Sequence, residues 1–257
     1  MVSAPIVTLR DVGKTFGNGV TALDGFDLDV RPGEFLTLLG PSGCGKSTVL
    51  RIIAGLSAVS GGRIEWSASE VGSAATRQIG FVFQEPTLMP WATVEANVRL
   101  PLKLRGLDRS SASRVAAALA RVGLVGFAQA YPRELSGGMK MRASIARALV
   151  TEPKLLLMDE PFAALDEITR FRLNRDLLSL WQSLGKTVVF VTHSVFESVY
   201  LSSRIVVMSP RPGRVFREIE IAAPYPRDER FRTSSEYAAW CRTASEALAE
   251  AMAGESS

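Results

Sequence analysis

The sequence contains few of the residues that build disulfide frameworks or metal clusters. Its 257 residues include two cysteines and one histidine. Cys44 and Cys241 lie far apart and show no metal-ligand spacing, so we expect neither a disulfide framework nor a cysteine-bound metal. Two isolated thiols are typical of a protein that works in a reducing compartment.

The sequence also lacks long apolar runs and segments of one charge sign. No stretch reaches the roughly 20 apolar residues that cross a bilayer, and the first residues lack the cationic start and apolar stretch of a secretory signal. The 30 Lys and Arg residues nearly balance the 26 Asp and Glu residues, which gives a net charge of +4, and the cations are scattered. Scattered cations disfavour a nucleic-acid-binding face. We therefore expect a cytoplasmic protein that is held at a membrane only through another protein.

Strand and helix patterns alternate along most of the chain. Short apolar runs typical of buried strands occur at residues 35–39, 79–83, 155–158, 187–192 and 204–209. Residues 85–150, in contrast, show helical patterns alone. The alternation predicts an α/β fold with a mostly parallel sheet core, and the helical block predicts an inserted helical subdomain. The predicted domains are a core of residues 1–84 and 151–220, a helical subdomain of residues 85–150 and a C-terminal helical extension of residues 221–257.

The C-terminal extension predicts one amphipathic helix. Thr233 and Glu236 have the spacing of a capping box, and apolar residues follow at helical spacing. The opposite face mixes acidic and basic residues, unlike a helix that lies on a membrane surface. We expect this helix to pack on the core or on a partner chain.

Residues 40–47, GPSGCGKS, match the pattern G-x-x-x-x-G-K-[ST] between an apolar strand and a helix. The glycines let the backbone bend so that successive N–H groups point at phosphate oxygens, and the helix N-terminus adds positive partial charge. Lys46 is expected to reach the β- and γ-phosphates, and the Ser47 hydroxyl to complete a Mg²⁺ shell. The segment predicts a nucleoside triphosphate site; a glycine-rich turn without function is the alternative.

Two acids follow directly on the apolar run at residues 155–158. A carboxylate at the end of a buried strand beside a phosphate loop can hold magnesium, which is the role we assign to Asp159. Glu160 alternates away from it and is placed to polarise an attacking water as a general base. A pair of solvated acids that open a turn before Pro161 is the alternative interpretation.

Ser136, Gly137 and Gly138 precede a long helical pattern. Ser136 can cap that helix, and the glycines can leave its first N–H groups open to an anion. Ser-Gly-Gly is equally typical of an ordinary N-terminal cap, so this segment alone leaves both interpretations open.

Together these motifs resemble the ATP-binding subunit of an ABC transporter, from about residue 6 to residue 217. The matching segments are Gly40–Thr48 for the Walker A motif, Leu135–Met139 for the signature, Leu155–Glu160 for the Walker B motif, Ala163–Asp166 for the D-loop, Gln84 for the Q-loop and His193 for the switch histidine. The resemblance implies a P-loop NTPase fold of the ABC ATPase type, with ATP and Mg²⁺ as cofactors.

The resemblance also implies roles for individual residues. Phe16 takes the position of the aromatic residue that stacks on adenine. The implied ATP-binding residues are Gly40, Ser42, Gly43, Cys44, Gly45, Lys46, Ser47, Thr48, Ser136, Gly137 and Gly138. The implied catalytic residues are Glu160, His193, Lys46 and Gln84, and the implied magnesium ligands are Ser47, Gln84 and Asp159. His193 would contact the γ-phosphate and orient the water; a structural histidine is the alternative without this context.

In this family two chains form a head-to-tail homodimer in the ATP state, so that the implied ATP lies between the Walker A motif of one chain and Ser136, Gly137 and Gly138 of the other. Two residues depart from the usual pattern. Met139 replaces the glutamine of the signature, and Met141 stands where glutamine is common. Met139 also occurs in one importer branch, so we do not interpret it as inactivating.

Residues 84–91, 159–162 and 209–214 resemble importers for nitrate, sulfonates, taurine and pyrimidine-type vitamin precursors. The segment that begins with His193 and Ser194 is closer to the vitamin-precursor importers. The resemblance implies an ATPase that powers solute uptake at the cytoplasmic face of the inner membrane. Its expected partners are an integral membrane permease, which contacts residues 86–91, and indirectly a solute-binding protein. A loop whose Trp91 turns into the core is the alternative for that segment.

An ABC-type ATPase that acts on nucleic acid or ribosomes is the alternative function. The segment between Lys46 and Ser136 is too short for coiled-coil arms, and the chain carries one cassette rather than two, so we expect no nucleic-acid partner.

Cys44 adds a separate hypothesis. Because it lies beside Lys46 and a helix N-terminus, we expect a reactive thiolate whose alkylation blocks ATP turnover and which ATP protects.

Overall fold

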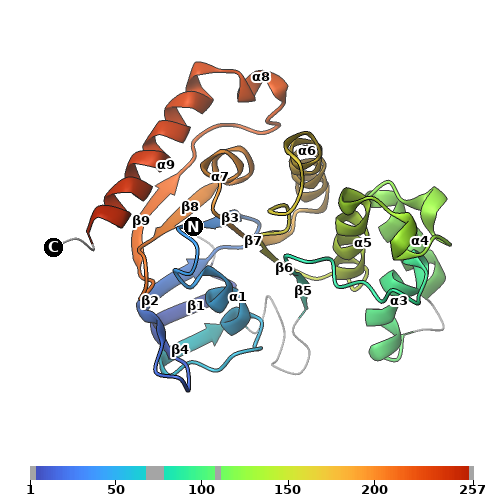
Figure 1. The fold of residues 1–257 in the computed structure, drawn as a ribbon, viewed down its shortest axis with the longest axis horizontal. Coiled ribbons are helices and arrows are strands. Elements are labelled where there is room, and N and C mark those ends of the chain that lie inside the picture. The colour runs from blue at the N-terminus through green and yellow to red at the C-terminus, as the bar shows by residue number, and fades with distance from the viewer. Residues whose placement is uncertain (1–3, 68–77, 108–110, 255–257) are drawn as a thin grey trace. The chain divides into compact units, whose positions relative to one another are not determined.

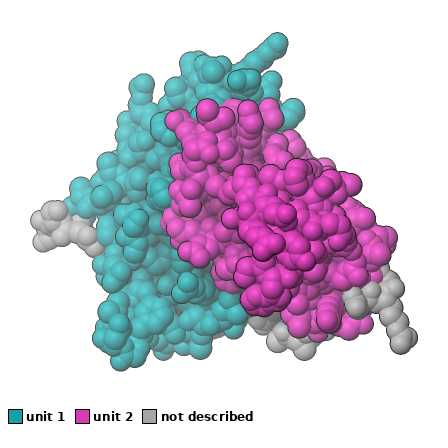
Figure 2. Space-filling model, turned by 45° about the vertical axis from the view of Figure 1, so that its right-hand side comes forward, with its two compact units in different colours: residues 1–77, 185–257 teal, residues 78–184 magenta. Residues whose placement is uncertain are grey.

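The computed structural model describes residues 4–67, 78–107 and 111–254. It consists of two compact units, drawn in teal and magenta in Figure 2. Unit 1 comprises Met1–Arg77 and Gly185–Ser257, and unit 2 comprises Gln78–Leu184. The domain boundaries predicted at residues 84, 150 and 220 lie at other positions along the chain and stay predictions.

Unit 1 contains a three-stranded antiparallel sheet. Its strands, in the order β2-β1-β4, are Thr21–Val30, Val7–Thr15 and Gly61–Trp66. Val7 pairs with Val30 on one side and with Trp66 on the other. Register shifts between Leu9 and Thr15 keep the polar end of the β1–β2 hairpin paired.

Unit 1 also contains a parallel layer centred on β3 (Phe35–Leu39), whose five residues are all buried. β3 pairs in parallel with β7 (Thr187–Thr192) and β8 (Arg204–Met208), and β8 pairs antiparallel with β9 (Val215–Glu220). Continuous apolar runs suit strands that are covered on both faces. Helix α1 (Lys46–Ile53) follows β3 and packs against β7.

Figure 1 shows helix α9 (Ser235–Ala253) lying along the edge formed by β8 and β9. The apolar side of α9 is buried there, so the expected packing of this helix on the core is confirmed. The predicted cap is wrong by one residue. Ser234, not Thr233, accepts the N–H of Tyr237 at 3.1 Å, because Thr233 ends the short helix α8 (Glu229–Arg232).

The segment between β9 and α8 is tied to helix α7 (Val195–Leu201) by one buried arginine. The Arg227 guanidinium donates to the backbone oxygens of Val199, Ser202 and Ala223 at 2.8, 2.9 and 3.0 Å. Burial lowers the pKa of Arg227. Carbonyl dipoles surround the charge and replace part of its lost hydration. The extension is therefore an integral part of unit 1.

Unit 2 contains two parallel strands and four α-helices within its described residues. They are β5 (Ile79–Val82), α3 (Val94–Leu104), α4 (Ser111–Arg121), α5 (Gly137–Leu149), β6 (Leu155–Asp159) and α6 (Glu167–Leu184). Helices α3, α4 and α5 pack on one another (Figure 1). The predicted parallel strands and intervening helices are thus confirmed in both units. In the described ranges, no helix has both the length and the apolar character needed to cross a membrane.

Candidate functional site

In unit 1, the register of the parallel layer brings two predicted site segments to one edge. Leu39 pairs with Thr192, so Gly40 and His193 each follow directly after paired residues at the carboxyl ends of β3 and β7. His193 is exposed at this edge. Ligands of open α/β sheets bind at the carboxyl ends of parallel strands, which is where these residues lie.

The phosphate loop, residues 40–47, closes around the ammonium group of Lys46. This side chain is 4% exposed, and its Nζ donates to the backbone oxygens of Gly40 and Pro41 at 2.8 Å each. A buried cation that donates to neutral carbonyl oxygens is well matched to a phosphate oxygen. The loop therefore presents positive charge to its own interior.

The start of α1 has no side-chain cap. Its N-cap is Gly45, with φ 105°. Gly43 has φ 79°. A Cβ on Gly45 would lie 2.8 Å from the Ala22 oxygen, so both conformation and space require glycine there. An uncapped helix N-terminus beside a buried ammonium fits an anion, as the sequence predicts.

The structure contradicts the accessibility that the Cys44 hypothesis requires. Cys44 is 1% exposed. A Cβ on Gly40 would lie 2.8 Å from its Sγ, which places the thiol against the base of the loop rather than toward solvent. A buried thiol reacts slowly with alkylating agents, so the expectation of a reactive Cys44 is wrong. The part that Cys44 plays in nucleotide binding through its backbone stays a prediction.

Phe16 lies in the turn between β1 and β2, where it is 41% exposed. The Lys14 ammonium lies 5.3 Å from the centre of its ring, a cation–π distance. Such a ring offers an open face to a planar ligand.

In unit 2, the register of β5 and β6 brings together the predicted metal and water ligands. Val82 pairs with Met158, so Gln84 and the acid pair Asp159 and Glu160 follow at the same end of neighbouring strands. Asp159 is 7% exposed, whereas Gln84 is exposed. Glu160 is half-buried and has φ 42°, a conformation that strains any residue other than glycine.

Ser136 is the N-cap of α5, and its hydroxyl accepts the N–H of Met139 at 3.3 Å. The two glycines that follow pack closely on their surroundings. A Cβ on Gly137 would lie 3.2 Å from Leu165, and one on Gly138 would lie 2.8 Å from Thr169. Both interpretations of this segment therefore keep a physical basis, since the cap exists and the glycines are also required for packing.

Two further residues of this region bear on the sequence predictions. Met141 is 2% exposed, so its apolar side chain is part of the core of unit 2. In the segment that resembles the D-loop, Asp166 accepts the N–H of Thr169 at 2.9 Å. This hydrogen bond lowers the pKa of the Asp166 carboxyl.

The segment at residues 86–91 exposes Trp91, whose side chain is 76% accessible. The alternative in which Trp91 turns into the core is therefore wrong. Asn97 of α3 holds the segment from behind: its Oδ1 accepts the Met89 N–H at 2.7 Å, and its Nδ2 donates to the Ala92 and Thr93 oxygens at 3.1 and 3.0 Å. The sequence analysis missed Asn97, although a polar residue between Val94 and Val98 on the apolar side of a helix is a usable signal.

Arg147 of α5 also holds this segment and was also missed. Its guanidinium donates to the Thr87 backbone oxygen at 2.7 Å, to the Thr87 hydroxyl at 2.8 Å and to the Pro86 oxygen at 2.9 Å. Burial lowers the pKa of Arg147. Thr87 has φ 46°, a rare conformation for a β-branched residue. The side chains at 97 and 147 together fix a stiff loop with an exposed tryptophan at its end.

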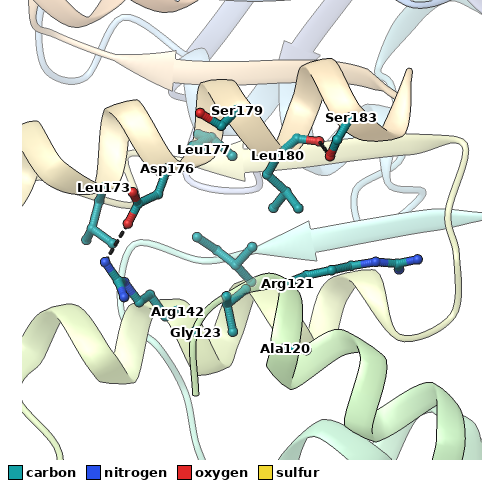
Figure 3. Close-up of a pocket in the computed structure, with 12 residues that line it drawn as sticks. Ala120, Arg121, Gly123, Arg142, Leu173, Asp176, Leu177, Ser179, Leu180 and Ser183 are labelled. Carbon is teal, nitrogen blue, oxygen red and sulfur yellow. Dashed lines mark hydrogen bonds and ion pairs between the residues drawn. The ribbon is translucent and has the colours of Figure 1, made fainter. Parts of the chain in front are cut away.

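A cavity of about 530 Å³ in unit 2 lies apart from these segments (Figure 3). Leu173, Leu177 and Leu180 of α6 line one side, and Arg142 of α5 pairs with Asp176 at one end. None of the site residues predicted from the sequence, all of which are described, lines this cavity. Its lining gives no reason to associate it with phosphate chemistry.

Comparison with known proteins identifies the family. The family model for the ABC transporter ATP-binding domain, described as "ABC transporter", matches residues 23–163. The chain belongs to the ABC transporter family. An uncharacterized ABC transporter ATP-binding protein of Methanocaldococcus jannaschii is 49% identical over 92% of this chain and 87% of its own length. The aliphatic sulfonates import ATP-binding protein SsuB of Bacillus subtilis is 45% identical over 91% of this chain and 90% of its own length.

Solved ABC cassettes have the same fold. The cbiO1 protein of Clostridium perfringens, part of the ABC transporter complex cbiONQ, matches with a TM-score of 0.74 and 29% identity over 85% of this chain and 90% of that one. A dimeric ATP-binding cassette bound to ADP and Pi matches with a TM-score of 0.71 and 35% identity over 85% of this chain and all of that one. The predicted ABC ATPase fold is confirmed. The chain is an ABC-type ATPase that binds ATP and couples its hydrolysis to transport.

Proposed function

We propose that this ABC ATPase is the motor subunit of an importer for a small solute of the group formed by nitrate, sulfonates, taurine and pyrimidine-type vitamin precursors. The observation that carries the proposal is similarity along nine tenths of the chain to relatives named for aliphatic sulfonate import. Two further SsuB relatives, both from Bacillus cereus, are 43% identical over 87% of this chain. Among the four solute classes, these names favour sulfonates.

The phosphate loop is the proposed ATP site. The backbone N–H groups of the loop and of the start of α1 would bind phosphate oxygens, and the Lys46 ammonium would exchange its bonds to the Gly40 and Pro41 oxygens for bonds to the β- and γ-phosphates. The ammonium would lose two hydrogen bonds to neutral oxygens, and the charge-assisted bonds to phosphate would offset that loss. The exposed ring of Phe16 is the proposed platform for adenine.

The proposed metal ligands are of types that suit Mg²⁺. Ser47, Gln84 and Asp159 supply hydroxyl, amide and carboxylate oxygens, which are hard ligands that magnesium prefers. When bound, Mg²⁺ neutralises charge on the β- and γ-phosphates. The low exposure of Asp159 strengthens its attraction for a cation, because less water screens the carboxylate.

Glu160 and His193 are the residues that we propose to act in hydrolysis. The Glu160 carboxylate would accept a proton from the attacking water, and the His193 imidazole would hold the γ-phosphate and orient that water. The left-handed backbone at Glu160 supports a functional need for this side chain, because strain of this kind concentrates at active sites.

We propose that two chains assemble head to tail in the ATP state, with Ser136, Gly137 and Gly138 of one chain on the ATP held by the other. The likeness to a dimeric cassette bound to ADP and Pi supports this arrangement. The Ser136 hydroxyl oxygen accepts the Met139 N–H at 3.3 Å, so its own proton would be donated to an incoming phosphate oxygen.

The surface formed by residues 86–91 is the proposed contact with the membrane permease. A stiff loop with an exposed tryptophan is typical of a partner-binding surface, and Asn97 and Arg147 keep it rigid. The permease would hold the chain at the cytoplasmic face of the inner membrane, and a solute-binding protein would deliver the solute from the other side.

The first test is to identify the partner. The tagged full-length Glu160→Gln variant is expressed in its native cells, and membranes are extracted with mild detergent in the presence of ATP. The amide keeps the shape of the side chain but removes the base, so the ATP-bound assembly should persist. We expect a polytopic membrane protein to co-purify, and mass spectrometry identifies it.

Two variants in the Glu160→Gln background sharpen this test. Trp91→Glu should lose the membrane protein, whereas Val125→Glu, at another exposed apolar position of unit 2 with 64% accessibility, should retain it. Recovery of DNA or ribosomal proteins without a permease would contradict the importer and support the alternative ABC ATPase. Cells that lack this chain should also lose uptake of radiolabelled alkanesulfonate, and unchanged uptake would contradict the sulfonate class.

A further inference from the structure

The loop between β8 and β9, residues 209–214, lies against the phosphate loop within unit 1. Its backbone is fixed on the start of β2: the Gly213 N–H donates to the Ala22 oxygen at 2.9 Å, and Gly213 bridges Leu23. Its two ends are also joined, since the Ser209 N–H donates to the Arg214 oxygen and the Arg214 N–H to the Ser209 hydroxyl, each at 3.0 Å. The loop is therefore a fixed part of the fold.

Two consecutive carbonyl groups of the phosphate loop face this loop. The Arg211 guanidinium donates from Nε and from Nη2 to the Gly43 oxygen, at 3.2 Å each. The next carbonyl, that of Cys44, lies directly on the backbone of Gly213, because a Cβ on Gly213 would be only 2.0 Å from the Cys44 oxygen. No side chain larger than hydrogen fits at Gly213 without displacing that carbonyl.

A planar trans peptide directs its N–H away from its C=O. Holding the Gly43 and Cys44 oxygens on the outside therefore turns the N–H groups of Cys44 and Gly45 to the inside. The Cys44 N–H makes a long bond of 3.4 Å to the Pro41 oxygen, which is also an acceptor for the Lys46 ammonium. The Cys44 N–H and the Lys46 ammonium thus share one acceptor, the Pro41 oxygen.

We propose that Arg211 and Gly213 form an outer brace that keeps the phosphate loop in its phosphate-binding shape. Arg211 is a positioning residue, since it acts on the peptide that carries the Cys44 N–H and not on the nucleotide. This inference rests on the proposed role of the phosphate loop and adds a determinant of ATP affinity that lies about 170 residues further along the chain.

The test is a titration of the purified full-length chain with a fluorescent ATP analogue that carries an N-methylanthraniloyl group. Arg211→Ala should weaken binding about tenfold, which corresponds to about 1.4 kcal/mol. Arg214→Ala is the matched control. It removes one exposed arginine from the same loop, but the Arg214 guanidinium pairs with Asp24, so binding should stay within about twofold.

Three readouts separate positioning from a general structural effect. The melting temperature of Arg211→Ala without nucleotide should equal that of the parent chain, because Arg211 is exposed and exposed polar contacts add little stability. The KM for ATP should rise about tenfold, while kcat at saturating ATP changes by less than about twofold. Arg211→Lys should recover part of the affinity, since an ammonium still reaches a carbonyl with fewer donors.

Unchanged affinity in Arg211→Ala would overturn the proposal, and so would equal losses in Arg211→Ala and Arg214→Ala, which would indicate a mere charge effect. Lys46→Ala in the same titration tests the proposed ATP site itself. If Lys46→Ala binds the analogue as tightly as the parent chain, the proposed ATP site is wrong. If Lys46→Ala loses binding while Arg211→Ala binds normally, only the brace is rejected. Gly213→Ala provides a second probe. It should abolish binding in a chain whose circular dichroism is unchanged, and normal binding by a folded Gly213→Ala would contradict the brace.

Discussion

The two units use left-handed backbone in opposite ways within their candidate site segments. In unit 1 the left-handed positions of the phosphate loop are glycines, Gly43 at φ 79° and Gly45 at φ 105°. In the site segments of unit 2 the left-handed positions carry side chains, Thr87 at φ 46° and Glu160 at φ 42°. Glycine adopts this region without penalty, whereas other residues lose about 1–2 kcal/mol.

The difference indicates what each unit contributes. At Gly43 and Gly45 the backbone itself is needed, because the left-handed turns aim N–H groups and leave room for neighbouring chain. At Glu160 glycine would adopt the same backbone with less strain, which is consistent with the proposed role of the carboxylate. The same comparison extends to helix starts: α1 begins without a side-chain cap, while α5 begins at Ser136, whose hydroxyl caps it.

The largest effect is expected for Gly45→Ala. The new Cβ would lie 2.8 Å from the Ala22 oxygen, so the loop must move and ATP affinity should fall by about 100-fold or more, as for a lost set of charge-assisted bonds. Gly55→Ala at the other end of α1 is the control. Gly55 has φ 73°, and a Cβ added there would have no atom within 4 Å, so this variant should lose about 1 kcal/mol of stability and keep its affinity. Fluorescence titration measures the ATP affinity of both variants, and urea unfolding measures their stability. Equal affinities in the two variants would contradict the prediction for Gly45→Ala.

Glu160→Gly should separate stability from activity. Relief of about 1–2 kcal/mol of backbone strain outweighs or equals the extra unfolded-chain entropy of about 0.5–1 kcal/mol, so the variant should be more stable in urea by up to about 1.5 kcal/mol. ATPase activity should fall about 100-fold, because the proposed general base is lost. Glu152→Gly is matched in conformation, with φ 53°, and should show the gain in stability with normal activity. If both variants retained activity, Glu160 would not be the base.

Ser136→Ala compares a cap that also has a proposed function with one that does not. Ser234 caps α9 with a bond of 3.1 Å to the Tyr237 N–H, against 3.3 Å for Ser136 and Met139. Each alanine variant should lose about 1 kcal/mol of stability. The ATPase rate should fall about tenfold in Ser136→Ala alone, which corresponds to one lost hydrogen bond to charged phosphate. Equal ATPase rates in Ser136→Ala and Ser234→Ala would show that Ser136 acts only as a helix cap.

The sequence was informative where the determinants are local. The phosphate loop, the acid pair that begins with the last residue of β6 and the buried strands are each encoded in a contiguous run, so pattern and spacing suffice to predict them. β9 was missed because its residues, VFREIE, mix charge on both sides, with only Ile219 buried. Its place in the sheet comes from pairing with β8, which no local pattern reveals.

Determinants that act across the chain were also missed. A Cβ built on Gly40 would meet both the Cys44 thiol and Met208 of β8, so the close packing around this thiol involves a distant strand and could not be inferred from its neighbours in sequence. The contact of Arg211 with Gly43 joins segments that are adjacent only because β3 and β8 are paired. For the same reason Arg147 gave no signal: the two carbonyls and the hydroxyl that it binds belong to a loop that precedes it by about 60 residues.

The smallest effect is expected at Thr87, where relief of backbone strain is opposed by losses of similar size. Thr87→Gly relieves about 1–2 kcal/mol of strain, but it adds chain entropy and removes the hydroxyl that accepts from Arg147 at 2.8 Å. A bond to a charged donor is worth about 1.5 kcal/mol at the low end, so the free energy of unfolding should change by less than about 0.5 kcal/mol. In an Arg147→Met background that bond is already absent, and Thr87→Gly should then stabilise by about 1 kcal/mol. Urea unfolding of the four chains measures this coupling; strictly additive values would show that the hydroxyl does not contribute to holding Thr87 in its left-handed conformation.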